Sequence, residues 1–270
     1  MKNSEGPKFL IIPAAGRGTR MREVNPDLPK EMLPIGNKPA IQYAVEEGIS
    51  VGIKNIIVVI NREKEEIRKF LETQYGDSNK TSGLISFTFL YQKELLGESD
   101  AIGYAKDIVG KNAVAVIYPD NLYLPAPGAL KTLIPVYIKY EKDVVALAQV
   151  RPDIALTISN AGRVDIRPLN SGLFHISKFI PKSDGHFIPR YKDELRSCGI
   201  YISGPYLFDH IEIVRSTVSS GEFTDYPVRL SILKDRGMVG CPLPGTVFDI
   251  GNPKGYELCL NYMKDNPNLT

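Results

Sequence analysis

The chain has 270 residues, and its 33 lysines and arginines nearly balance its 31 aspartates and glutamates, giving a formal net charge of +2. A charge so near neutrality argues against broad electrostatic binding to nucleic acid or an anionic membrane. Three widely spaced cysteines form no CxxC pair, so we expect them to be buried in a reducing compartment rather than in a zinc site or disulfide. The apolar run at residues 9–15 is too short for a secretory or membrane-spanning segment, which predicts a cytoplasmic protein with no membrane partner.

The first half of the chain alternates short apolar runs with helix-favouring stretches. The expected strands are residues 9–12, 55–60, 84–91, 113–118 and 144–150. The expected helices are residues 63–72, 99–109 and 130–140, the second with Ser99 as N-cap. Strands apolar on both faces that alternate with helices predict a Rossmann-like α/β fold, a mostly parallel sheet flanked by helices. A ligand is then expected beyond the carboxyl ends of the strands.

The pattern changes after about residue 151. Residues 159–162 and 170–172 are typical of turns between short strands, which indicates an antiparallel excursion from the sheet, and residues 206–219 again favour a helix. No repeat, low-complexity run or linker interrupts the chain, so we expect one domain over residues 1–270. His175, His186 and His210 show no ligand spacing and are expected at the surface or in turns.

The loop after the first predicted strand carries the clearest chemical signal. Small residues and two glycines allow backbone N–H groups to approach a polyphosphate closely, Arg20 offers a two-pronged contact to phosphate oxygens, and Lys30 a point charge. Met21 occupies the position of the third glycine of the dinucleotide fingerprint, and no Gly-Lys-Ser/Thr follows for a P-loop. On these grounds alone the loop is a weak signal, open to interpretation as a tight turn. The loop residues are Ala14, Ala15, Gly16, Gly18 and Thr19.

A longer string makes the prediction more specific. Ala-Ala-Gly-x-Gly-Thr-Arg-Met at residues 14–21, followed by Pro-Lys-Glu-Met-Leu-Pro-Ile at 29–35, resembles the signature of the sugar-1-phosphate nucleotidylyltransferases. The continuation at residues 37–53 is most similar to the bacterial UTP–glucose-1-phosphate uridylyltransferases. The resemblance implies that the loop and Arg20 hold the triphosphate, that Lys30 touches the α-phosphate, and that Gln92 and Gly97 read the base edge. It also implies a nucleotide-binding half at residues 1–124 and a sugar-phosphate-binding half at 125–270.

The family's two metal-binding aspartates have matching positions here. Asp120 follows a buried strand, and Asp249 stands in Asp-Ile-Gly-Asn-Pro, which resembles the family's Asp-x-Gly-x-Pro. One or two carboxylates together with phosphate oxygens are what Mg²⁺ prefers, so Mg²⁺ is the expected cofactor. Pro119 replaces the family's glycine before the first aspartate, which removes a backbone donor at that point.

The sugar-binding half departs further from the family. Glu222 in Glu-Phe-Thr-Asp and Gly199 in Gly-Ile-Tyr match its sugar-binding positions, but Ile180 stands where the Glu-Lys-Pro lysine would grip the sugar phosphate. The Gly-x-Gly-His-Ala of the uridylyltransferases is also altered, to Gly-Glu-Ser-Asp-Ala at residues 97–101.

The resemblance implies in-line transfer of a nucleotidyl group from a nucleoside triphosphate, UTP favoured, to a sugar-1-phosphate, glucose-1-phosphate favoured. Three alternatives stay open: thymidylyl transfer, another phosphorylated acceptor, and a regulatory protein that binds nucleotide sugars without turnover. The expected partners are the two substrates and further copies of the chain in a dimer or tetramer, with no nucleic acid.

Overall fold

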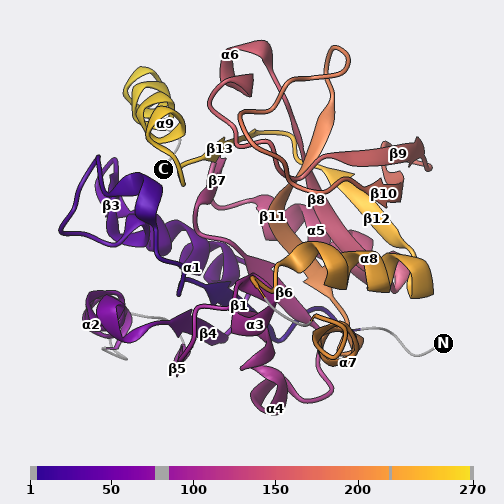
Figure 1. The fold of residues 1–270 in the computed structure, drawn as a ribbon, viewed down its shortest axis with the longest axis horizontal. Helices are drawn as coiled ribbons and strands as arrows, with labels where there is room; N and C mark the ends of the chain where they lie inside the picture. Colours follow the sequence, from indigo (N-terminus) through magenta and orange to yellow (C-terminus); the bar gives the residue numbers. More distant parts are fainter. Residues whose placement is uncertain (1–4, 77–84, 219–220, 268–270) are drawn as a thin grey trace.

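The computed structural model describes residues 5–76, 85–218 and 221–267, and its centre is a single large sheet (Figure 1). Its strands are β1 (Phe9–Pro13), β4 (Asn55–Ile60), β5 (Ser86–Tyr91), β6 (Val114–Ile117), β8 (Asp143–Gln149), β9 (Val164–Pro168), β10 (Phe174–Phe179), β11 (Leu195–Ser203) and β12 (Met238–Pro242). They lie in the order β5-β4-β1-β6-β11-β8-β12-β10-β9.

The strand directions confirm the predicted fold class. β5, β4, β1 and β6 pair in parallel, and so do β8 and β12. β11 is inserted antiparallel between β6 and β8, and the β9–β10 hairpin closes one edge. The turn predicted at residues 170–172 joins the two strands of this hairpin, so the antiparallel excursion is confirmed as well.

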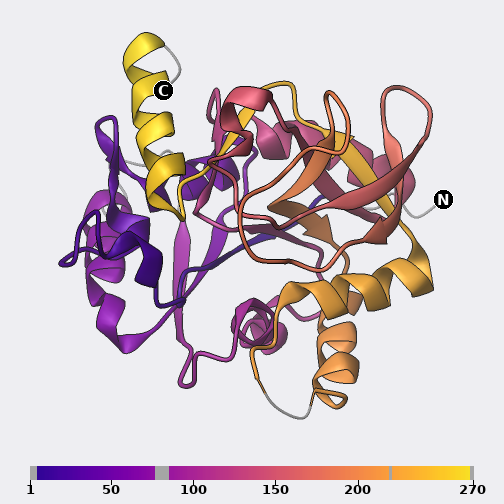
Figure 2. The same ribbon diagram turned by 45° about the horizontal axis from the view of Figure 1, so that its top comes forward.

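Helices cover both faces of the sheet. Neighbouring residues of a strand point to opposite faces, so apolar side chains of the same strand pack against helices on both sides. Leu10 and Ile12 of β1 pack with α1 (Ala40–Ser50), α2 (Glu65–Tyr75) and α5 (Ala129–Tyr140). Ile11 packs on the other side with α3 (Glu98–Gly103), α4 (Lys106–Val109), α7 (Tyr206–Arg215) and α8 (Asp225–Arg236). Figure 2 shows α7 and α8 side by side on that second face.

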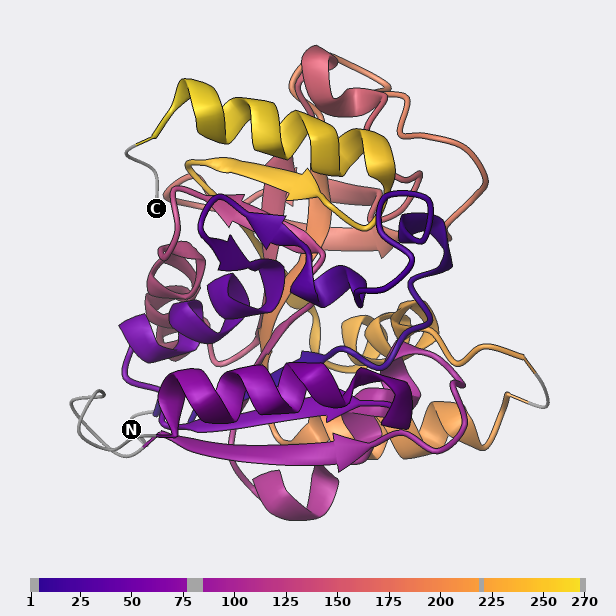
Figure 3. The same cartoon turned by 90° about the vertical axis from the view of Figure 1, so that its left-hand side faces the viewer.

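A smaller layer lies beyond the carboxyl ends of the parallel strands. β7 (Asn121–Leu124) pairs antiparallel with β13 (Thr246–Asp249), and α9 (Pro253–Asp265) lies over this ribbon (Figure 3). The remaining short elements are η1 (Thr19–Met21), η2 (Lys30–Met32), β2 (Pro34–Ile35), β3 (Lys38–Pro39), η3 (Arg62–Lys64) and α6 (Pro152–Ala155). The β7–β13 pairing places Asn121 opposite Asp249, so two distant segments meet at this edge.

Three local predictions were wrong. The helix expected at residues 99–109 is divided into α3 and α4, and the N-cap of α3 is Gly97. Ser99 lies inside α3, where its hydroxyl donates to the Thr224 carbonyl at 3.0 Å. His210 is buried in α7 with Nδ1 2.8 Å from the Ser231 hydroxyl, not at the surface.

The remaining expectations concern the cysteines, the ends of two predicted elements and membrane-spanning helices. The three cysteines are buried, as predicted. The first residue of the strand expected at 84–91 and the last of the helix expected at 206–219 lie outside the described residues. Within residues 5–76, 85–218 and 221–267, no helix is long and apolar enough to cross a membrane.

Candidate functional site

The glycine loop leaves the end of β1 and is held by side chains of η3 and its N-cap, directly after β4. Lys64 Nζ donates to the Ala14 carbonyl at 2.8 Å, and Asn61 Nδ2 donates to the Ala15 carbonyl at 2.6 Å. Both loop carbonyls are therefore turned into the protein. Such an arrangement favours anion binding, since carbonyl oxygens that faced a phosphate would repel it.

The tip of the loop has free space around Gly16, and at Gly18 the loop lies against η2. A side-chain carbon added at Gly16 would meet no atom within 4 Å, and Gly18 adopts a left-handed φ of 62°. A carbon added at Gly18 would lie 3.5 Å from Lys30 Cγ, so the loop and Lys30 are neighbours. Thr19 and Arg20 lie in η1, and Arg20 Nη1 donates to the Ser159 hydroxyl at 2.9 Å.

Lys30 and Asp120 form the central ion pair of the site. Lys30 Nζ lies 2.5 Å from Asp120 Oδ2. Burial alone would lower the pKa of Lys30, but Asp120, Glu31 and Asp249 outweigh it and raise that pKa. Burial would likewise raise the pKa of Asp120, but Lys30 and Arg20 lower it overall. Both groups are thus held in their charged forms.

Asp249 stands beside Asp120 because β13 pairs with β7. The Ile250 N–H donates to the Asp120 carbonyl at 2.9 Å. A carbon added to Gly251 would lie 2.8 Å from Asp120 Oδ2 and 3.2 Å from Asp249 Oδ1, so the two carboxylates converge above this glycine. Asp249 Oδ2 accepts from the Ser159 N–H at 2.9 Å.

The two aspartates fit a divalent cation that is shared with a substrate. No group of three or more His, Cys, Asp or Glu side chains with metal-binding geometry occurs in the described part of the chain. Mg²⁺ sites on phosphate substrates commonly use only one or two carboxylates, and the substrate phosphates and waters complete the coordination. The pair is therefore suited to a cation brought with a nucleotide.

The positions expected to read the base lie after β5. Gln92 is buried, and its Nε2 donates to the Gly97 carbonyl at 3.0 Å. Gly97 has φ 113°, and a side-chain carbon there would lie 2.6 Å from the Phe223 carbonyl. Only glycine fits this close approach. Because Glu222 adjoins Phe223, the expected base-reading and sugar-binding positions are brought together.

Gly199 lies against the strand end that carries Asp120. Its φ is 66°, and a side-chain carbon would lie 2.7 Å from Tyr118 Cδ2 and 2.9 Å from Asn121 Nδ2. The register of β11 shifts between Ser197 and Tyr201, which lets Gly199 come this close. Ile180 instead donates its N–H to the Arg163 carbonyl, at the far end of β10.

Sequence reasoning missed several polar residues around the same edge. Glu98 lies near Asp225, Glu222 and Asp120, and the surrounding protein together with those like charges raises its pKa. The Tyr118 hydroxyl donates to Asp225 Oδ2 at 3.2 Å. Acidic residues replace those of the family within residues 97–101, and this difference could have indicated a role for Glu98. Only the fold shows that Glu98, Tyr118 and Asp225 lie together.

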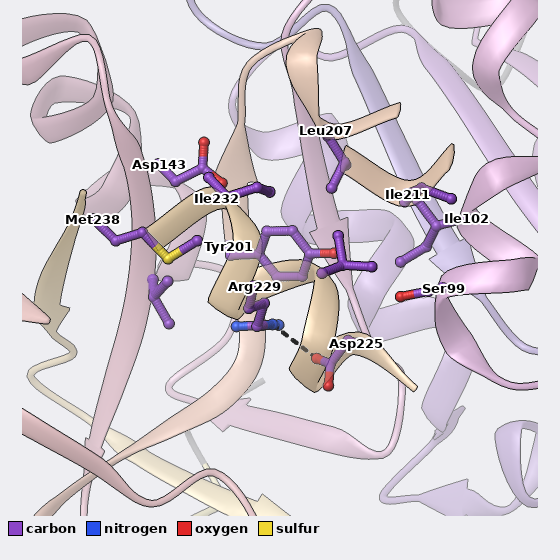
Figure 4. A pocket seen from close by; sticks show the side chains of 12 residues that line it. Ser99, Ile102, Asp143, Tyr201, Leu207, Ile211, Asp225, Arg229, Ile232 and Met238 are labelled. Atoms are coloured by element: carbon purple, nitrogen blue, oxygen red, sulfur yellow. Dashed lines mark ion pairs between the residues drawn. The ribbon is translucent and has the colours of Figure 1, made fainter. Parts of the chain in front are cut away.

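Beneath this edge an ion pair between the buried Arg229 and the partly exposed Asp225 supports the wall of the site. Arg229 Nε lies 2.8 Å from Asp225 Oδ2, and the guanidinium stacks 4.2 Å from the centre of the Tyr201 ring. Figure 4 shows Asp225 and Arg229 facing each other at a cavity between α7, α8 and the sheet. The cavity has room for about one water-sized molecule, so it is part of the packing and not a nucleotide site.

A glycine loop, two cations and two convergent carboxylates lie together beyond the carboxyl ends of the parallel strands of a Rossmann-like sheet, an arrangement suited to phosphate transfer. Residues 10–256 match the family described as nucleotidyl transferase, and the chain belongs to that family. It is a nucleotidyltransferase, and the resemblance seen in its sequence is confirmed.

Relatives of known name match over nearly the whole chain. The chain is 31% identical over 280 residues to the putative UTP–glucose-1-phosphate uridylyltransferase of Bacillus subtilis (strain 168), with 97% of this chain and 98% of that one covered. It is 28% identical over 276 residues to the UTP–glucose-1-phosphate uridylyltransferase of Pseudomonas aeruginosa, with 96% of each covered. A crystal structure of UDP-glucose pyrophosphorylase complexed with UDP-glucose superimposes with a TM-score of 0.80 at 27% identity, covering 96% of this chain and 100% of that one.

Proposed function

We propose that the protein transfers the uridylyl group of UTP to glucose-1-phosphate, giving UDP-glucose and pyrophosphate. The observation that carries the proposal is the convergence of Lys30, Asp120 and Asp249 beside the glycine loop. The choice of UTP and glucose-1-phosphate is supported by the names of the relatives from Bacillus subtilis and Pseudomonas aeruginosa.

In the proposed reaction an oxygen of the sugar phosphate attacks the α-phosphorus of UTP. The bond from that phosphorus to the bridging oxygen breaks, and pyrophosphate leaves with the bond electrons. The attacking phosphate is already ionised, so no general base is needed and catalysis consists of alignment and charge neutralisation. Arg20 holds the β- and γ-phosphates, and Lys30 exchanges Asp120 for oxygens of the α-phosphate. The loop residues Ala14, Ala15, Gly16, Gly18 and Thr19 line the triphosphate.

We assign the divalent cation to Asp120 and Asp249, and propose that it is Mg²⁺. When bound, Mg²⁺ would supply positive charge to the phosphate oxygens of the two substrates. Gln92 and Gly97 would read the base, and Gly199 and Glu222 would contact the sugar.

The isoleucine at position 180 favours one competing function, the binding of a nucleotide sugar without turnover. A cation that grips the acceptor phosphate is absent from this position, although Lys178 and Lys182 flank it in the sequence. Thymidylyl transfer and a different phosphorylated acceptor remain the alternatives within the enzyme class.

A pyrophosphate-release screen tests these alternatives together. Four nucleoside triphosphates would be combined with a panel of sugar phosphates and phosphorylated alcohols, each with and without Mg²⁺. We expect release with UTP and glucose-1-phosphate only when Mg²⁺ is present. Binding of UDP-glucose with no release from any combination would establish the regulatory function instead.

We further propose that the chain is one domain whose residues 1–124 bind the nucleotide and 125–270 the sugar phosphate. We propose that it acts in the cytoplasm as a homodimer or homotetramer. Light scattering on the purified protein measures the oligomeric state.

A further inference from the structure

The orientation of the Gln92 side-chain amide is fixed by two acceptors. Its Nε2 lies 3.0 Å from the Gly97 carbonyl oxygen and 2.7 Å from Asp100 Oδ2. An amide oxygen in that place would face two other oxygens, so the atom there must be the NH₂ group, and both of its hydrogens are used.

The opposite end of the amide remains available to a ligand. No donor among residues 5–76, 85–218 and 221–267 is directed at Gln92 Oε1. With the nitrogen occupied, the side chain can offer a base only this acceptor oxygen.

Asp100 is itself held by a charge from the second half of the chain. Its side chain is only 3% exposed, and its Oδ1 accepts from Arg215 Nη2 at the end of α7. The Arg215 guanidinium also lies 5.4 Å from the centre of the Phe223 ring, next to Glu222. One carboxylate oxygen thus faces Arg215 and the other faces Gln92, so the carboxylate links the two.

We propose that Asp100, held by Arg215, is a positioning residue that sets base specificity by fixing the Gln92 amide with its oxygen toward the base. The inference rests on the proposed function, because it takes Gln92 as the residue that reads the base. An acceptor matches the N3–H of uracil or thymine. It opposes the N3 of cytosine, which carries no hydrogen and is itself an acceptor. The substrate class is therefore a nucleotide with an imide base.

Asp100→Asn is the sharpest test, because it can reverse the amide. Arg215 retains the Asn oxygen, which leaves the Asn NH₂ facing Gln92. Two NH₂ groups then oppose each other, and only the Gly97 carbonyl still accepts from the Gln92 NH₂. The preference for the wild-type orientation is therefore weakened, and Gln92 can turn its own NH₂ toward the base. We expect the ratio of kcat/KM for UTP over CTP to fall by about tenfold to a hundredfold.

A second-site variant separates positioning from a structural role. Arg215→Met alone keeps an acceptor toward Gln92, so the UTP/CTP ratio should stay unchanged even where stability falls. In the double variant Asp100→Asn/Arg215→Met, the Asn is free to turn its oxygen to Gln92, and the ratio should return to within about threefold of the wild type. Asp107→Asn, an exposed acid on α4, is the matched control and should leave the ratio unchanged.

An unchanged ratio in Asp100→Asn, or no recovery in the double variant, overturns the inference while leaving uridylyl transfer intact. A wild-type protein that releases no pyrophosphate with any nucleotide overturns the proposed function. In that case, dissociation constants for UTP and CTP, measured calorimetrically on the same variants, give the ratio in place of kcat/KM. Absence of any preference for UTP binding by the wild type then overturns this inference too.

Discussion

Lys30 is positioned before a substrate binds, because Asp120 holds its ammonium group at 2.5 Å beside the glycine loop. The pairing gives the ammonium group a fixed partner, and the raised pKa of Lys30 keeps it charged through the physiological range. A preorganised cation of this kind stabilises charge that develops in the transition state.

Removing this charge should slow turnover without unfolding the protein. Lys30→Ala is expected to lower kcat on the order of 10²–10³-fold, the usual cost of losing one preorganised contact. Pyrophosphate release measures the rate, and circular dichroism checks the fold. Lys111→Ala, which removes an exposed lysine, is the control. Turnover at the wild-type rate in Lys30→Ala would contradict the assignment of this residue.

Individual residues could be predicted from sequence where they lie in a continuous motif. Arg20 and Lys30 belong to such a string. The partners of the predicted residues could not be found in this way: Ser159 contacts both Arg20 and Asp249, yet it is far from each in the chain. Its hydrogen bonds depend on where the turn after α6 returns to the sheet edge.

Among the secondary-structure elements, η2 and η3 are joined by a buried ion pair. Lys64 Nζ lies 2.8 Å from Glu31 Oε2, and the two side chains are 6% and 1% exposed. Glu31 directly follows Lys30, so this pair links the glycine loop, η2 and η3 into one unit.

Breaking the pair on one side should be costly. Lys64→Met leaves Glu31 buried without a partner, and we expect a loss of about 3–5 kcal/mol in the free energy of unfolding. Glu31→Leu/Lys64→Met should recover part of that loss, because no unpaired charge remains, although the Ala14 carbonyl still lacks the donor that Lys64 supplied. Urea denaturation measures both, with the exposed Lys69→Met as control. A single variant as stable as the double would argue against the pair.

Asp143 links β8 to the start of α7. It accepts from the Ser203 hydroxyl at 2.8 Å, from the Tyr206 hydroxyl at 2.5 Å and from the Gly204 N–H at 3.4 Å. Burial outweighs these hydrogen bonds and raises its pKa to about 6. The folded state therefore favours the protonated acid more strongly than the unfolded state does.

This raised pKa predicts a stability loss with rising pH. The contribution is fully present below about pH 4 and is lost as the pH rises to about 6, by about 3 kcal/mol in all. Asp143→Asn does not titrate, so its unfolding free energy relative to the wild type should improve over that window and be constant above it. Parallel curves for the two proteins across pH 4 to 7 would contradict the prediction.

Helices and strands were predictable where hydrophobic period and length agreed, as for β4 and α5. α9 was missed although it has a start signal: Asn252 caps it by accepting from the Gly255 N–H, and Pro253 occupies the first turn. α8 was missed because Tyr226 and Pro227 obscure its period. The break between α3 and α4 was missed because only tertiary contacts decide where that helix ends.

At the scale of the whole molecule, the sheet joins the two halves of the chain. β6 belongs to the first half, yet its neighbour β11 comes from the second. The fold class followed from alternating strands and helices, but the position of β11 could not, because strand order depends on pairing between distant segments.

The sheet order predicts that residues 1–124 do not fold alone. That fragment would leave β6 with an unpaired edge and the α5-facing part of the core exposed. We expect it to lack cooperative thermal unfolding by circular dichroism, whereas the full chain should show one transition with coincident probes. A cooperatively folding fragment would indicate two domains.

The insertion of β11 between β6 and β8 also constrains the order of assembly during synthesis. Residues 195–203 emerge from the ribosome long after both of the strands that they join, so the central gap in the sheet stays open until then. Pairing over such sequence separations is slow, and exposed strand edges invite association between chains. The growing chain thus has a period of vulnerability to aggregation that lasts until β11, and after it β12, have paired with their neighbours, and β11 also carries Gly199 to the acceptor side of the site.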